Sequence, residues 1–132
     1  MCNKKKSIAR TFPVFIVGSI LIISGFLKIA AIHPMLSHFK EMGFGRAGIA
    51  LLGSAEMIFS ILFLIVSTSR FGLLLLTGYL GGAMAMEISF GQVIAPMVFL
   101  VLLWLAAFLR EPSAFLPISF YKNSAHLKKI PS

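Results

Sequence analysis

The chain has 132 residues, of which 58% are hydrophobic, and it contains 12 lysines and arginines against four acidic residues. This apolar composition excludes an ordinary water-soluble domain. The net charge of +8 is also found in nucleic-acid-binding proteins, but basic residues that flank apolar segments orient membrane proteins, so we predict no nucleic-acid partner. Because Cys2 is the one cysteine, neither an internal disulfide nor a thiolate zinc site can form within the chain.

Four apolar blocks follow one another along the chain, at residues 12–32, 47–66, 71–89 and 94–109. Each approaches the roughly 20 residues, at ~1.5 Å rise per residue, that a helix needs to span a bilayer, and none alternates like a barrel strand. The connections are short, so neighbouring helices are expected to pack antiparallel. We therefore predict an all-α fold, a transmembrane four-helix bundle that forms a single domain over residues 1–132.

The amino-terminal segment allows a second interpretation. Lys4, Lys5, Lys6 and Arg10 precede the first apolar block, which is also the pattern of a cleaved secretory signal. The block is longer than the roughly 7 to 15 apolar residues of a signal and contains Lys28 near its end. We therefore predict a first helix that is retained.

Lysine and arginine are distributed unevenly between the segments outside the blocks. The two tails and the turn at residues 67–70 together hold nine, whereas the loop at residues 34–46 holds two, Lys40 and Arg46. Because basic residues stay on the cytoplasmic side, both the amino and the carboxyl terminus are predicted to be cytoplasmic. The predicted localisation is the cell (cytoplasmic) membrane, with several passes through the bilayer.

Three ionisable residues fall inside the predicted spans: Lys28, Glu56 and Glu87. A charge at the centre of a span costs about 2.5 to 3.5 kcal/mol, so each is expected to be paired, neutralised or hydrated. From the helical rise, Lys28 and Glu87 share a depth of about 24 Å from the inner boundary, and Glu56 lies about 13 Å below the outer one. For Lys28 the alternatives are an ion pair within the bundle and extension of its long side chain to the outer headgroups.

Two aromatic residues complete the candidate binding site. Tyr79 comes eight residues before Glu87, on roughly the same face of the third helix, and Trp104 on the fourth helix either lines the same pocket or faces lipid. For both residues, simple packing is the alternative. With Lys28 and Glu56, the predicted pocket has at most one net negative charge, which suits a cation, a proton relay or a polar quinone-type headgroup.

Small residues predict where the helices approach one another. Gly78 and Gly82 form a GxxxG pair with Gly81 beside it, and Gly53 comes three residues before Glu56. Residues of this size allow helix backbones to come into contact in a membrane. We therefore predict helix packing at these four glycines.

No pattern in the sequence indicates a metal site or independent catalysis. His33 and His38 are five residues apart, unlike the i, i+4 pair of a helical metal site, so no metal is predicted. The chain also has no nucleophile with an oriented base and no nucleotide-binding loop. Whether it is a subunit of an enzyme stays open at this point.

Short motifs occur at residues 24–28 (Ser-Gly-Phe-Leu-Lys), 42–44 (Met-Gly-Phe), 52–56 (Leu-Gly-Ser-Ala-Glu), 78–83 (Gly-Tyr-Leu-Gly-Gly-Ala) and 103–112, where Leu-Trp leads to Arg-Glu-Pro. In order and spacing, over nearly the whole chain, they resemble the DoxX-like family of small four-helix membrane proteins. The resemblance implies a four-helix bundle and a link with membrane subunits of thiosulfate:quinone oxidoreductases. Family members commonly carry a histidine shortly after the glycine motif, where this chain has Glu87-Ile88-Ser89.

These observations favour two classes of function. The first is an accessory or quinone/redox-associated membrane subunit with a polar intramembrane pocket. The sequence leaves the cofactor unknown, and quinone is the candidate that this class suggests. The second is a small proton-coupled transporter or exporter, whose membrane carboxylates exchange protons for a cationic substrate. A non-catalytic assembly partner of a membrane complex is a third interpretation. The expected partners are the lipid bilayer, another membrane or redox protein, or a second copy of the chain.

Overall fold

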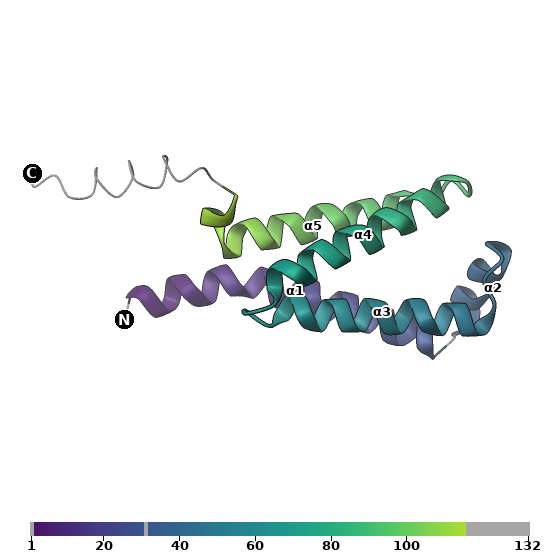
Figure 1. Cartoon of the computed structure of the whole chain (residues 1–132), viewed down its shortest axis with the longest axis horizontal. Helices are drawn as coiled ribbons and strands as arrows, with labels where there is room; N and C mark the ends of the chain where they lie inside the picture. Colours follow the sequence, from purple (N-terminus) through teal and green to yellow (C-terminus); the bar gives the residue numbers. More distant parts are fainter. Residues whose placement is uncertain (1, 31, 116–132) are drawn as a thin grey trace, which may run out of the picture.

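The computed structural model describes residues 2–30 and 32–115 (Figure 1). These residues form five α-helices and a short 3-10 helix: α1 (Cys2–Ile29), α2 (His33–Glu41), α3 (Arg46–Leu64), α4 (Ser69–Ile88), α5 (Ile94–Arg110) and η1 (Pro112–Ala114). They contain no strand, which confirms the all-α class. Lys122, Lys128 and Lys129 of the carboxyl tail lie outside the described residues, so the cytoplasmic placement of that tail stays a prediction.

Among the described residues, three helices are long and apolar enough to cross a membrane: Ile8–Ile29 within α1, Arg46–Leu64 and Ser69–Ile88. They match the first three predicted blocks within a few residues, although α1 also continues through the basic segment and Pro13 toward the amino terminus. The fourth block is the apolar helix α5, whose 17 residues fall slightly short of the roughly 20 of a typical span. The chain is therefore a helical membrane protein, and its fourth span stays a prediction.

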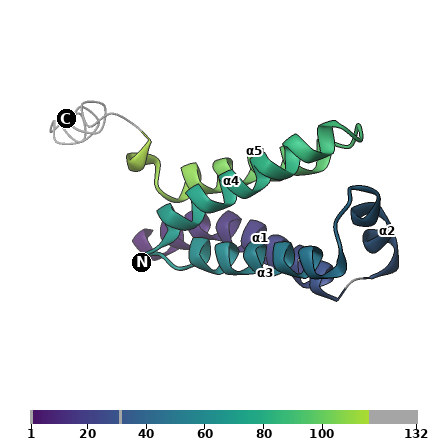
Figure 2. The same cartoon turned by 45° about the vertical axis from the view of Figure 1, so that its right-hand side comes forward.

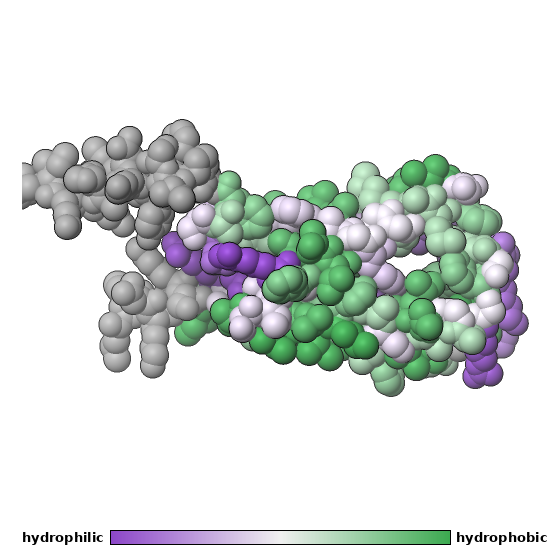
Figure 3. All heavy atoms as spheres, in the orientation of Figure 1, coloured by the Kyte–Doolittle hydropathy of each residue, from purple (hydrophilic) through white to green (hydrophobic). Residues whose placement is uncertain are grey.

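The outer surface of these helices is apolar. Many large hydrophobic side chains are exposed, among them Leu51 at 70% and Leu74 at 69%. The space-filling view shows apolar residues over the middle of the molecule, with hydrophilic residues toward its two ends (Figure 3). Water is a poor solvent for such a surface, whereas hydrocarbon chains cover it without the hydrophobic cost. The surface thus supports contact with a lipid bilayer.

The long helices form two pairs that diverge from one another. α1 packs mainly against α3, and α4 runs beside α5 (Figure 1 and Figure 2). The pairs lie close together at the closed end, where α3 passes into α4, and they separate toward the open end, which carries α2. The hydrophobic core lies between the pairs and includes Val14, Leu21, Phe63, Leu76 and Leu103.

Polar contacts tie the two helix pairs together at the closed end. The Thr68 hydroxyl donates to a carbonyl oxygen in the last turn of α3 at 2.9 Å, and Nη1 of Arg110 donates to the next carbonyl oxygen, that of Phe63, at 3.0 Å. A helix end leaves such carbonyl groups without amide partners, so these contacts satisfy them. Within the second pair, Arg70 of α4 and Glu111, the residue after α5, form an exposed salt bridge of 2.9 Å.

Two glycines hold α1 and α3 in direct backbone contact. A methyl group on Gly25 would lie 2.8 Å from the carbonyl oxygen of Gly53, and one on Gly53 would lie 2.6 Å from that of Gly25. Gly53 therefore packs at a helix contact, as predicted. A methyl group on Gly78, Gly81 or Gly82 would meet no described atom within 4 Å. The prediction of close packing was wrong at these three glycines for contacts within the chain, because the helix pairs diverge along α4.

Candidate functional site

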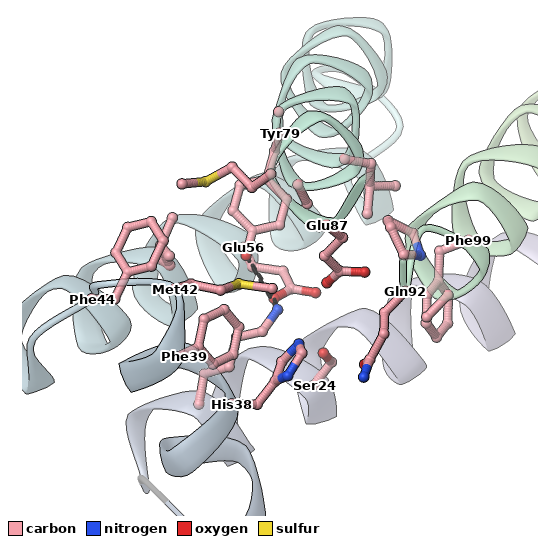
Figure 4. Close-up of a pocket in the computed structure, with 18 residues that line it drawn as sticks. Ser24, His38, Phe39, Met42, Phe44, Glu56, Tyr79, Glu87, Gln92 and Phe99 are labelled. Carbon is pink, nitrogen blue, oxygen red and sulfur yellow. Dashed lines mark hydrogen bonds and ion pairs between the residues drawn. The ribbon is translucent and has the colours of Figure 1, made fainter. Parts of the chain in front are cut away.

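Lys28, Glu56 and Tyr79 meet inside the protein, each from a different helix. The Lys28 ammonium forms a salt bridge with Oε2 of Glu56 and donates to the Tyr79 hydroxyl oxygen at 3.2 Å. The Tyr79 hydroxyl in turn donates to Oε2 of Glu56 at 3.2 Å. The three side chains form a closed Lys–Glu–Tyr triangle that joins α1, α3 and α4 (Figure 4). Of the two alternatives for Lys28, the ion pair is confirmed.

The glycine contact explains why the two charges meet. Lys28 follows Gly25 by three residues on α1, and Glu56 follows Gly53 by three residues on α3, so each charge lies on the contact face of its helix. The helices are antiparallel, which places the two residues on opposite sides of the crossing. Side chains lean toward the amino terminus of their helix, so these two lean toward each other, and the long lysine closes the gap.

The triangle is withdrawn from the surface. The Glu56 side chain is 2% exposed and that of Lys28 is 11% exposed, and the Lys28 nitrogen lies 5.5 Å from the centre of the Tyr79 ring. A charge buried alone costs several kcal/mol, whereas a paired and hydrogen-bonded charge recovers part of its lost hydration. The three side chains therefore depend on one another in these low-dielectric surroundings.

A cavity of about 500 Å³ opens beside the triangle, at the open end between the helix pairs. The side chains of Ser24, His38, Glu87 and Gln92 add further polar groups to its lining (Figure 4). Its wall is otherwise built largely from aromatic and methionine side chains: Phe39, Met42, Phe44, Met86 and Phe99. This volume, and the combination of an apolar wall with a few polar groups, are typical of small-molecule binding sites.

Glu87 has no cationic partner among the described residues, whereas Glu56 is paired with Lys28. Its carboxylate points into the cavity (Figure 4), and it makes no hydrogen bond or salt bridge within residues 2–30 and 32–115. Lys28 and Glu56 cancel each other's charge. With His38 neutral, the cavity therefore carries one net negative charge, the limit that the sequence predicts for this pocket.

Trp104 does not line this cavity, so the structure does not bring it together with the other predicted binding residues. It lies on the outer side of α5 with 42% of its surface exposed. There its indole Nε1 donates to the Thr77 hydroxyl oxygen at 3.1 Å, and its ring lies edge-on to that of Phe115, with centroids 5.6 Å apart. Of the two roles considered for Trp104, its position fits that of a lipid-facing residue, because this face of α5 is turned away from the cavity.

The four other predicted binding residues line the cavity, but the wall supplied by α2 was not predicted. His38 and Phe39 belong to this wall, in a segment that was expected to be a loop. The available signals were Pro34 in the first turn of α2, a position that suits proline, and the separation of apolar from polar residues around the helix. Gln92, in the turn after α4, had no comparable signal.

No protein-family model, curated protein or solved structure matches this chain. The resemblance to DoxX-like proteins accordingly stays a prediction. In the part of the chain that the structure describes, no group of three or more His, Cys, Asp or Glu side chains is placed to hold a metal ion. The residues themselves define a helical membrane protein with a cavity of about 500 Å³ beside a buried ion pair.

Proposed function

We propose that the chain is a multi-pass protein of the cytoplasmic membrane, in which α1, α3, α4 and α5 form a four-helix transmembrane bundle with both termini in the cytoplasm. The closed end, where α1 and α4 begin and α3 and α5 end, carries Lys5, Arg10, Arg70 and Arg110 at or near those helix termini. Such a cluster favours the cytoplasmic side. The cavity, at the open end, then lies in the outer half of the bilayer.

Cysteine labelling in intact cells tests this orientation. In a Cys2→Ser background, Lys5→Cys and Glu41→Cys place one thiol at each end of the bundle. We expect a membrane-impermeant maleimide to label the cysteine at position 41 and to reach the cysteine at position 5 only after the cells are opened. The proposed orientation is contradicted if the cysteine at position 5 is labelled in intact cells and the cysteine at position 41 is labelled only after the cells are opened.

The proposed function is that of an accessory membrane subunit that binds a quinone-type headgroup for a redox partner. The Lys–Glu–Tyr triangle carries this proposal. Of the three N–H groups of the Lys28 ammonium, one donates to Glu56 and one to Tyr79, so the third is available to a ligand carbonyl oxygen. Only Oε2 of Glu56 is engaged in these contacts, which leaves Oε1 to accept from a hydroxyl group. A quinone presents carbonyl oxygens, and its reduced form presents hydroxyl groups.

The wall of the cavity suits the remainder of such a ligand. Phe39, Phe44 and Phe99 offer aromatic surfaces against which a planar ring packs favourably. The molecular surface is hollowed between the helix pairs near the open end (Figure 3), which provides a lateral path from the lipid. A ligand with an apolar tail can therefore place its headgroup in the cavity and leave its tail in the bilayer.

We assign this chain a binding role within a larger redox system. A reaction of its own is not favoured by the triangle, because Glu56 is held by a salt bridge and the residues that the structure describes place no nucleophile hydrogen-bonded to a base beside it. The resemblance to DoxX-like proteins, with their link to thiosulfate:quinone oxidoreductases, favours a second membrane or redox protein as the electron-transfer partner.

A quinone titration tests the binding role. Purified protein in detergent micelles is dialysed against a short-chain ubiquinone and, separately, a short-chain menaquinone. The variant Lys28→Met/Glu56→Gln removes the ionised groups without leaving a lone charge, and Lys40→Met is the matched control, because Lys40 is exposed on α2 and does not line the cavity. We expect saturable binding of one of the quinones to the wild type and the control, and binding weaker by roughly tenfold or more in the double variant, since a charged hydrogen bond contributes about 1.5 to 3 kcal/mol. Equal binding in all three proteins contradicts the proposal.

A further inference from the structure

Glu87 gives the cavity a recognition element that is separate from the Lys–Glu–Tyr triangle. It lines the cavity, and its carboxylate makes no hydrogen bond or salt bridge among the described residues. We propose that Glu87 binds the positively charged group of a lipophilic organic cation, such as a quaternary onium ion or a protonated amine that carries aromatic substituents. This ligand class goes beyond the proposed quinone-type binding and does not depend on it.

The charges that face the cavity do not balance. Lys28 is committed to Glu56, and Tyr79 is a neutral donor to the same carboxylate. The remaining ionisable groups in the lining are Glu87 and His38. With His38 neutral, the negative charge of Glu87 is unmatched, and in surroundings of low dielectric such a charge attracts a cation strongly.

The backbone around Glu87 favours a cation as well. Glu87 is the residue before Ile88, with which α4 ends. The amides of the following turn donate to the carbonyl oxygens of Glu87 and Ile88, and the carboxyl end of the helix carries the negative pole of the helix dipole. The helix end and the carboxylate therefore both attract cations, and both repel an anionic ligand.

The wall of the cavity favours an organic cation over a metal ion. Phe39, Phe44, Phe99 and Tyr79 line the same space, and aromatic faces attract cations that have shed their water. Hard metal ions such as calcium need about six or more oxygen ligands, whereas this lining is mostly apolar. The volume of about 500 Å³ also leaves room for the apolar substituents of an organic ion.

Tetraphenylphosphonium is a suitable probe, because its charge is permanent and its substituents are aromatic. Its binding to the purified full-length protein in micelles is measured by equilibrium dialysis for the wild type, Glu87→Gln and Glu41→Gln. Glu41 is the matched control, because it is exposed at the end of α2 and does not line the cavity. We expect saturable binding to the wild type and to Glu41→Gln, and affinity weaker by at least roughly tenfold in Glu87→Gln, through loss of a charged contact. Glu87→Asp keeps the charge and is expected to retain most of the affinity.

The inference is overturned if Glu87→Gln has the same affinity for the phosphonium ion as the wild type, or if the wild type shows no saturable binding. The quinone titration on the same proteins separates this inference from the proposed function. A wild type that binds no quinone contradicts the proposed function alone, whereas a wild type that binds no phosphonium ion contradicts this inference alone. If Glu87→Gln and Glu87→Asp both lose both ligands, Glu87 has a structural role and the inference fails.

Discussion

Replacing Lys28 by methionine removes the charge that balances Glu56, and we expect this change to lower the free energy of unfolding by about 3 kcal/mol. Removal of one partner from a buried ion pair typically costs about 3 to 5 kcal/mol. The Glu56 side chain is only 2% exposed, so water replaces the lost ammonium group poorly. The Tyr79 hydroxyl still donates to Glu56, which places the expected loss at the lower end of that range.

The double variant Lys28→Met/Glu56→Gln separates the charge from the packing. A buried ion pair replaced by uncharged residues of similar volume is often close to neutral in stability, and the glutamine carbonyl can still accept from Tyr79. We therefore expect the double variant to be more stable than Lys28→Met alone. A double-mutant cycle should give a coupling energy of at least about 2 kcal/mol between the two positions.

Unfolding in mixed micelles at increasing SDS mole fraction, followed by circular dichroism, measures these differences. Arg70→Met and Glu111→Gln provide the control, because this second salt bridge is 73% and 45% exposed on its two sides. An exposed pair contributes about 0 to 1 kcal/mol. The reasoning is refuted if Lys28→Met destabilises the protein no more than Arg70→Met, or if the double variant is less stable than the single one.

Two further predictions concern the glycines and the tryptophan. Gly53→Ala should destabilise the protein by about 1 to 3 kcal/mol, because the added methyl group would lie 2.6 Å from the Gly25 carbonyl oxygen. Gly81→Ala should be neutral or stabilising by up to about 1 kcal/mol in the same SDS titration, because no described atom lies within 4 Å of the new methyl group. If Gly53→Ala and Gly81→Ala lower the free energy of unfolding equally, the assigned helix contacts are contradicted. Trp104→Phe should leave the affinity for quinone and phosphonium ion unchanged in equilibrium dialysis, since Trp104 lies outside the cavity; a large loss would place it at the site.

The first three apolar helices and the pairing of charges inside them could be predicted from the sequence, because a membrane limits both the length of a spanning helix and the places where a charge can lie. Hydrocarbon requires helices of a certain length, and a charge inside a span must find a partner or water. Lys28 and Glu56 satisfy this requirement with each other. Tyr79 and Glu87 share a helix face by their spacing, and both line the cavity.

Which glycines make helix contacts, and which segments build the cavity wall, depends on how the helices are arranged in space, and the sequence does not give that arrangement. A glycine permits close approach without requiring it, so Gly53 touches α1 whereas Gly81 faces open space. The difference arises because the helix pairs are tied at the closed end, through Arg110 among others, and diverge toward the open end. The position of α2 against that opening is set by tertiary contacts, so its contribution to the cavity could not be predicted.

Native mass spectrometry of the gently purified protein tests most directly whether the cavity binds a small molecule at the triangle. We predict one bound molecule of quinone mass per wild-type chain, released on collisional activation and absent from Lys28→Met/Glu56→Gln prepared in the same way. A wild-type chain that is empty as purified, and that stays empty after incubation with quinone, would contradict this function.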